Sequence, residues 1–237
     1  MLVRVHEWVD GSTPRAPTSI RLASELGGVL ATIHRLGVPC GQGAQVDQWY
    51  RAAHGAAHWR QLAACAERAG RTWAGRLRGA LPLLAEVEAL VAARAAEAVP
   101  LVMTHSDLVP GNVLVSAGGR PWIVDWDDAG PWNAAEEVAA AVVSWSSRAH
   151  GEPDERVALA LMEGYRAAGG VLQDHTPTVL AASLSAVANW LELNLRHSLD
   201  LAANQAVRRQ AEAEVTSALI ELPRRLARVD RWTGLLG

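Results

Sequence analysis

The sequence contains no lysine and no phenylalanine, and it has only two cysteines among its 237 residues. All 22 basic residues are therefore arginine, so the chain has no lysine ammonium with which to bind an anion. Cys40 and Cys65 lie far apart and form no C-x-x-C pattern. They fit a reducing compartment and are most simply two small buried hydrophobic residues.

Long apolar runs are also missing. No uninterrupted run reaches the roughly 18 residues of a membrane span, and the first residues lack the basic start and long apolar centre of a signal peptide. The formal net charge of −3 and the pI near 6.2 exclude bulk attraction to nucleic acid or to an anionic membrane. Because half of the residues are hydrophobic, we expect a globular, cytoplasmic protein.

Repeats, low-complexity tracts and disordered linkers are absent from the sequence as well. The composition is uniform from end to end, which favours a single domain over residues 1–237.

The most informative segment covers residues 101–130. It opens with an apolar run at 101–103, after which Pro110-Gly111 can continue neither a helix nor a central strand, so residues 105–112 must form a loop. The β-branched runs 113–115 and 122–124 follow, separated by Gly118-Gly119. A Gly-Gly pair between two apolar runs predicts a β-hairpin.

This hairpin would place polar side chains at one end. Asn112 precedes its first strand and Asp125 follows its second, and the loop presents Asp107 at that same end. Carboxylate and amide oxygens suit a hard cation such as Mg²⁺, which usually shares its ligands with substrate phosphates. The spacing His105-x-Asp107-x-x-x-x-Asn112, followed by an Asp after the next strand, also matches the template for phosphoryl transfer.

Residues 105–115 and 123–131 together resemble the aminoglycoside phosphotransferase and choline kinase-like family, in which Pro-Gly inside the catalytic loop is characteristic. The resemblance implies a catalytic base at Asp107, Mg²⁺ ligands at Asn112 and Asp125, and a residue that braces the loop at His105. Asp127 falls where the family often has a second acidic residue. The reaction implied is transfer of the γ-phosphoryl group of ATP or GTP to a hydroxyl of a small molecule.

The resemblance also implies a fold: the mostly helical large C-terminal lobe of a protein kinase-like fold, with a small β-hairpin. Residues 2–11 would be the hinge strand, with His6, Glu7 and Trp8 facing an adenine ring, and residues 12–237 the helical lobe. An edge strand followed by a turn is the alternative for residues 2–11. The small N-terminal lobe, with its Gly-rich loop and strand lysine, would be largely absent from this chain.

That absence leaves catalysis open. The chain could be a truncated kinase, or a degenerate, non-catalytic lobe that binds a ligand or a protein. An arginine or a partner chain in place of the missing lobe has no support in the sequence. The identity of the acceptor is not readable from the residues.

The rest of the chain predicts helices. Apolar spacing and cap residues place them at 17–36, 46–68, 80–98, 134–148, 155–168, 178–199 and 205–229, the last broken at Pro223. In the helix 80–98, Glu86, Glu88 and Arg94 should point outward.

Several polar residues allow two interpretations. His54 and His58 are four apart and would share one helical face, as zinc ligands do, but no H-E-x-x-H pattern accompanies them, which favours packing or surface histidines. His34 is likewise expected to be a hydrogen-bonded packing residue. By the family resemblance, Glu137 would brace the catalytic loop, and Asn133 stands where Asp is frequent. Asp174, Trp190 and Glu192 could touch the acceptor, although such a Trp is more often core.

Overall fold

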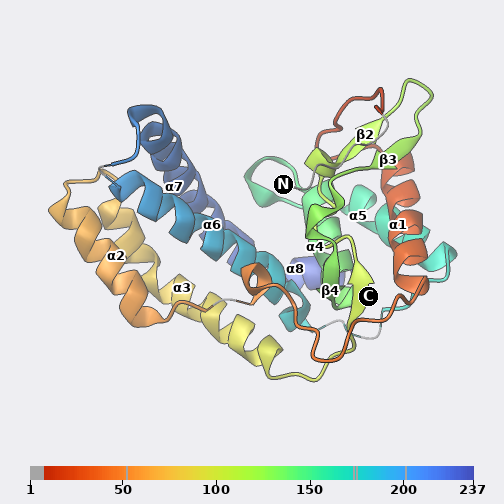
Figure 1. Ribbon diagram of the computed structural model, residues 1–237, viewed down its shortest axis with the longest axis horizontal. Helices are drawn as coiled ribbons and strands as arrows, with labels where there is room; N and C mark the ends of the chain where they lie inside the picture. The colour runs from red at the N-terminus through yellow and green to blue at the C-terminus, as the bar shows by residue number, and fades with distance from the viewer. Residues whose placement is uncertain (1–7, 52, 173, 175, 201) are drawn as a thin grey trace. The chain divides into compact units, whose positions relative to one another are not determined.

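In the computed structural model, residues 8–237 are described except for residues 52, 173, 175 and 201 (Figure 1). The chain divides into two compact units, each built from two segments. Unit 1 comprises Met1–Ala44 and Leu101–Gln173, and unit 2 comprises Gln45–Pro100 and Asp174–Gly237. The predicted adenine contacts at His6 and Glu7 lie outside the described residues.

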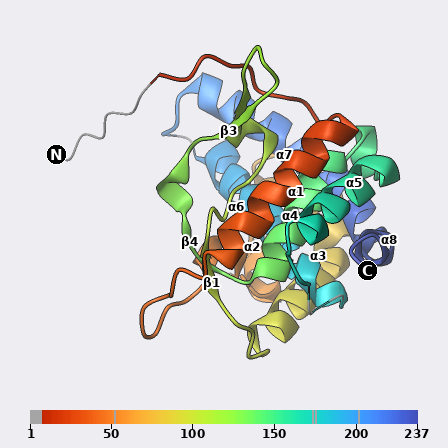
Figure 2. The ribbon, with the colours of Figure 1, turned by 90° about the vertical axis from the view of Figure 1, so that its right-hand side faces the viewer.

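Unit 1 is held together by two helices, α1 (Ile20–Arg35) and α5 (Glu155–Ala167), which lie side by side in Figure 2. Glycines allow this close approach. A Cβ atom on Gly27 would lie 2.0 Å from the carbonyl oxygen of Leu161, and one on Gly164 would lie 2.0 Å from that of Ser24. The backbones therefore meet directly, with no side chain between them at this point. The helix predicted at 17–36 is confirmed, and Ser19 caps it.

Two short antiparallel pairs lie between these helices in the sequence. The predicted hairpin is confirmed, with β2 (Val113–Val115) paired to β3 (Pro121–Ile123), and Gly119 adopts the left-handed conformation, φ +80°, that its turn requires. The second pair, β1 (Val102–Thr104) with β4 (Gly130–Trp132), was not predicted from the sequence. This pairing closes the ends of the segment 101–130 on each other.

The helix α4 (Ala134–Ser146) follows β4 and completes unit 1. Its first turn is capped by Asn133, whose side chain accepts from two backbone N–H groups. Of the segment predicted as a hinge strand leading into a turn, residues 8–11 form no strand, and the earlier residues lie outside the described part of the chain. Ser12 alone bridges to Val115, through two backbone hydrogen bonds of 2.9 and 3.0 Å.

Unit 2 is helical. It contains α2 (Ala56–Arg68), α3 (Ala74–Ala95), α6 (Ala181–Leu199), α7 (Gln205–Leu226) and α8 (Val229–Gly234). The helix α6 packs against α3 and α7, and α2 packs against α3. Short 3-10 helices add η1 (Gln48–Tyr50) and η5 (Pro177–Leu180) to this unit, while η2 (Pro110–Asn112), η3 (Trp126–Asp128) and η4 (Ala149–Gly151) belong to unit 1.

Three helix boundaries differ from the sequence prediction. Of the helix expected at 46–68, the α-helix α2 begins only at Ala56, because Gly55 before it has a φ of +82°, which is not helical. The helix expected at 80–98 starts at Ala74, so Pro82 lies inside it rather than near its start. The break expected at Pro223 does not occur, since α7 continues through Pro223 to Leu226.

The outward orientation predicted for Arg94 is also wrong. Its side chain is fully buried and pairs with Asp174 at 2.5 Å and Glu97 at 2.6 Å. Glu88 is half-buried and accepts hydrogen bonds from the backbone of His54 and Gly55. Both helical side chains thus serve packing within unit 2 that periodicity alone does not reveal.

Cys40 and Cys65 are free thiols, half-buried rather than buried. Among the helices of the described residues, none combines the length and the apolar character that a membrane crossing requires.

Candidate active site

The loop that follows β1 carries Asp107 on a constrained backbone. Ser106, immediately before it, has φ +67°, a conformation that costs free energy for a residue other than glycine. Two hydrogen bonds hold the Ser106 N–H, one to Thr104 Oγ1 at 3.1 Å and one to Glu137 Oε1 at 2.7 Å. Strain at this position is therefore compensated by buried hydrogen bonds, and it sets the direction in which Asp107 leaves the loop.

Asn112 contacts Asp107 directly. Its side-chain amide donates to Oδ2 of Asp107 at 2.8 Å and to the Asp107 carbonyl at 2.9 Å. The amide nitrogen is thereby used within the loop, and the amide oxygen Oδ1 is left as the group that can ligate a cation. Asn112 also receives the N–H of Val124 on its backbone oxygen at 3.0 Å, which ties the two ends of the hairpin together.

Asp125 follows β3 and has a left-handed backbone, φ +63° and ψ +63°. It is exposed, as is Asp128 at the end of η3. Burial raises the pKa of Asp107 above its usual 3.8; the hydrogen bond from Asn112 opposes this, and the negative charges of Asp128 and Asp125 raise the pKa further. Asp107 thus lies close enough to Asp128 and Asp125 for their charges to act on its carboxyl group.

His105 is fully buried below this loop. Its Nε2 lies 3.0 Å from the carbonyl oxygen of Val124, so Nε2 carries the proton and Nδ1 is the acceptor. The backbone N–H of Asp107 points to that Nδ1 at 3.3 Å, and the ring contacts Trp126 edge-on, with centroids 4.6 Å apart. His105 therefore joins the Asp107 loop to the strand that leads into Asp125.

A buried chain of hydrogen bonds continues from the loop into the helices. Glu137 on α4 accepts from Ser106 with Oε1 and from His34 Nε2 with Oε2 at 2.5 Å, and Nδ1 of His34 lies 3.0 Å from the Tyr165 hydroxyl. All three side chains are buried, and burial, with the nearby Glu137, raises the pKa of Tyr165 to about 12. The Tyr165 hydroxyl is therefore the donor to His34.

The sequence had pointed to parts of this arrangement. His34 is the hydrogen-bonded packing residue that was predicted, and Glu137 contacts the loop. The sequence did not reveal the hydrogen bond of His34 to Tyr165, which lies 131 residues away, or the contribution of the Asp128 charge. The run Asp127-Asp128 was the available signal for the latter.

The other residues singled out from the sequence have the following exposures and contacts. Trp8 is 85% exposed and donates to Asp10 at 2.8 Å. Asp127 is exposed in η3. In unit 2, Asp174 is paired with Arg94, Trp190 is exposed on α6, and Glu192 is buried.

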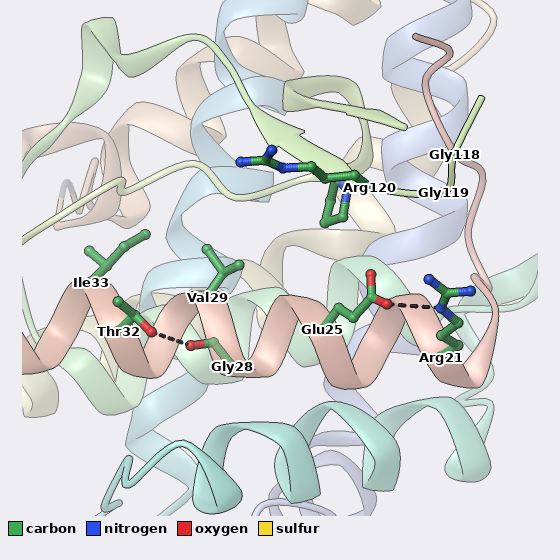
Figure 3. Close-up of a pocket in the computed structure, with 10 residues that line it drawn as sticks. Arg21, Glu25, Gly28, Val29, Thr32, Ile33, Gly118, Gly119 and Arg120 are labelled. Carbon is green, nitrogen blue, oxygen red and sulfur yellow. Dashed lines mark hydrogen bonds and ion pairs between the residues drawn. The ribbon is translucent and has the colours of Figure 1, made fainter. Parts of the chain in front are cut away.

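An open groove of about 630 Å³ lies elsewhere in unit 1, between α1 and the turn of the hairpin (Figure 3). Residues of α1 form one wall, and Gly118 to Pro121 form the other. Arg21 and Glu25 pair with each other at 2.9 Å along the helix. Asp107 is not among the residues that line this groove.

Comparison with known proteins gives the family. The model of the phosphotransferase enzyme family matches residues 1–171, which include the whole loop and hairpin described above. The chain belongs to this phosphotransferase family. Within the family match, Asp107, Asn112 and Asp125 come from the segment that carries the resemblance.

Solved structures share the fold of this phosphotransferase-family chain. An aminoglycoside phosphotransferase from Alicyclobacillus acidocaldarius has a TM-score of 0.62 at 18% identity, over 96% of this chain and 70% of that one. Spectinomycin phosphotransferase, in complex with ADP and spectinomycin, has a TM-score of 0.58 at 18% identity, over 91% and 68%. Choline kinase from Cryptosporidium parvum gives 0.58 at 14% identity, over 97% and 72%.

These similarities confirm the predicted kinase-like, mostly helical fold with a small hairpin. No curated protein was found to match the chain by sequence.

Proposed function

We propose that this protein transfers the γ-phosphoryl group of ATP or GTP to a hydroxyl group of a small molecule, with Mg²⁺. One observation carries the proposal: Asp107 is hydrogen-bonded to Asn112 and lies within repulsive range of Asp125 and Asp128. A concentration of carboxylates on a constrained loop costs free energy unless a cation or a reacting group uses it. The family match supports the reaction class.

The donor set fits Mg²⁺. All candidate ligand atoms are oxygens, which this cation prefers, and their mutual repulsion is what a divalent charge would relieve. Asn112, through Oδ1, and Asp125 would hold the ion. When bound, Mg²⁺ would neutralise phosphate charge as phosphoryl transfer proceeds.

Asp107 would orient the acceptor hydroxyl and take its proton. Its raised pKa makes it a better proton acceptor than an exposed aspartate. His105 and Glu137 would act indirectly, since they accept hydrogen bonds from the backbone N–H groups of Asp107 and Ser106. Precise placement of the base matters because phosphoryl transfer depends mainly on positioning and charge.

Nucleotide binding is proposed by analogy with the ADP complex of spectinomycin phosphotransferase. His6, Glu7 and Trp8 remain our candidates for contacts to the base. Because the chain contains no lysine, its own residues would need arginine or the metal to neutralise the phosphates. We therefore expect weaker nucleotide binding than in a kinase with a strand lysine.

The test is phosphoryl transfer from ATP or GTP with Mg²⁺ to a panel of hydroxyl acceptors that includes choline, spectinomycin and an aminoglycoside. Asp107→Asn should lower the rate by about 10²–10⁴-fold with little change in nucleotide affinity. Asp125→Ala should abolish Mg²⁺-dependent nucleotide binding measured by calorimetry. Asp230→Asn, an exposed change on α8, is the control and should change neither.

Two results would overturn the proposal. If Asp125→Ala and the unaltered chain bind Mg²⁺-nucleotide equally and negligibly, the chain is the non-catalytic binding module considered from the sequence. If transfer occurs and Asp107→Asn leaves its rate unchanged, the role assigned to Asp107 is wrong.

A further inference from the structure

Two histidines and a glutamate meet in unit 2. His54 precedes α2, His58 lies in the first turn of α2, and Glu192 lies on α6. One ligand atom from each lies within 4.8 Å of the others, and among the described residues this is the group of three or more His, Cys, Asp or Glu side chains that comes so close. The helix α2 contacts α6 within this unit.

The His54 ring is oriented by its neighbours. Asn189 donates its amide to the carbonyl oxygen of Trp49 at 2.6 Å, so its Oδ1 is left to accept from His54 Nε2, also at 2.6 Å. Nε2 of His54 therefore carries the proton and Nδ1 presents a lone pair. Metal-binding histidines show this pattern, in which one ring nitrogen donates to a fixed acceptor and the other faces the metal.

The backbone around His54 is fixed as well. Glu88 accepts from the N–H groups of His54 and Gly55 at 2.9 and 2.8 Å and from Trp59 Nε1 at 2.7 Å. The Glu88 carboxylate thus anchors the start of α2 and keeps His54 next to His58. Because folding already orders the segment that carries His54, metal binding costs less additional conformational entropy.

His58 and Glu192 complete the group. The two imidazole rings stack at 5.1 Å between centroids and 22° between planes, and His58 Nε2 lies 3.0 Å from Glu192 Oε1. That same oxygen accepts from Nε of Arg196, whose side chain is 63% exposed. Arg196 is the competing cation at this carboxylate, and it can move into solvent when a metal ion takes its place.

We propose that His54, His58 and Glu192 bind one divalent transition-metal ion, of which Zn²⁺ is the best match. Two imidazole nitrogens and one carboxylate oxygen are borderline ligands that suit Zn²⁺ and not Mg²⁺. Bonds of about 2.0–2.1 Å in a tetrahedron bring ligand atoms to about 3.3 Å apart, so the side chains must close in slightly from their present spacing. The half-exposed His58 can make that movement.

This inference does not depend on the proposed phosphoryl transfer. By joining the start of α2 to α6, a bound ion would stabilise unit 2, since a ligand that binds only the folded state raises its stability.

The test is titration of the full chain with Zn²⁺ after treatment with a chelator, in buffer containing excess Mg²⁺, followed by calorimetry and thermal unfolding. We expect one equivalent to bind and the melting temperature to rise. Co²⁺ in place of Zn²⁺ should give the intense visible absorption of a tetrahedral site. His54→Ala, His58→Ala and Glu192→Gln should each lose this absorption.

Three further variants make the assignment specific. His197→Ala removes an exposed histidine from the same helix as Glu192 and should leave binding unchanged. Arg196→Gln should bind Zn²⁺ more tightly, because the competing guanidinium is gone, and this exposed change is compatible with folding. Asn189→Ala should weaken binding by about 10–100-fold.

The proposal is overturned if the unaltered chain binds no Zn²⁺ in the presence of Mg²⁺, or if Arg196→Gln leaves the affinity unchanged or lowers it. Equal binding by the unaltered chain and by His58→Ala would likewise assign the metal to another place.

Discussion

Asp107, the proposed catalytic base, also lowers the stability of the folded chain when it is ionised. Its pKa lies above 3.8 in the folded chain, first because of burial and then because of Asp128 and Asp125. A carboxyl with a raised pKa stabilises the fold fully below pH 3.8, and this contribution is lost as the pH rises through the folded pKa. Once the pH exceeds the folded pKa, the ionised Asp107 therefore lowers stability.

Asp107→Asn should consequently be no less stable than the unaltered chain at pH 7, with a melting temperature higher by on the order of 1 °C, although its transfer rate should be about 10²–10⁴-fold lower. The asparagine oxygen can still accept from Asn112, so that hydrogen bond is retained. Thermal unfolding between pH 7 and pH 4 measures the effect, and the difference should shrink as the pH falls toward 3.8. A variant that melts lower than the unaltered chain at pH 7 contradicts this account.

The buried chain Tyr165–His34–Glu137 should contribute to stability and to the placement of Asp107. His34→Ala leaves the buried Glu137 carboxylate without one of its donors, which should cost at least about 2 kcal/mol of unfolding free energy. Tyr165→Phe removes only the last hydroxyl and should cost about 1 kcal/mol. Denaturant unfolding checks both values.

The order of these two costs is the informative result. If Tyr165→Phe destabilises the protein as much as His34→Ala does, the hydrogen-bonded series Tyr165–His34–Glu137 does not serve to satisfy the Glu137 carboxylate.

At the level of whole elements, the contact between α1 and α5 depends on the absence of side chains. A Cβ on Gly27 would overlap the Leu161 carbonyl oxygen, whereas one on Gly28 would meet Ala168 Cβ at an ordinary 3.9 Å. Neighbouring glycines of one helix thus have different functions: Gly27 sets the helix spacing, and Gly28 does not.

Gly27→Ala should therefore destabilise the chain by about 3 kcal/mol or more, because α1 and α5 must move apart. Gly28→Ala is the matched control and should stabilise it by about 0.5–1 kcal/mol, through the better helix propensity of alanine. Chemical denaturation of both variants measures the difference. Similar effects of the two changes would show that the helices do not meet at Gly27.

Sequence prediction succeeded for some secondary-structure elements and failed for others. The hairpin was predictable because its strands and its Gly-Gly turn are adjacent in the chain. The pairing of β1 with β4 was not, because Val102 and Trp132 are separated by the whole loop and hairpin. Helix interruption at Gly55 depends on its contacts to Glu88, a residue of another helix.

At the scale of the whole molecule, each of the two compact units combines two segments that are distant in the sequence. Unit 1 joins α1 to the segment that carries Asp107, and unit 2 joins α2 and α3 to the last helices. Two buried ion pairs cross these joins within their units, Glu137 with His34 in unit 1 and Arg94 with Asp174 in unit 2. Uniform composition gave no sign of where the segments would meet.

The sequence by itself determined the local parts of this protein: the loop with Asp107 and Asn112, the hairpin that leads to Asp125, the family to which the chain belongs, and most of the helices. Their causes lie in neighbouring residues, namely turn formers, caps and apolar periodicity. Only the tertiary structure decided that His34 contacts Tyr165, that Arg94 is buried, and that His54 and His58 lie next to Glu192. These contacts join residues 80 or more positions apart, and only packing determines which distant polar groups must satisfy one another once water is excluded.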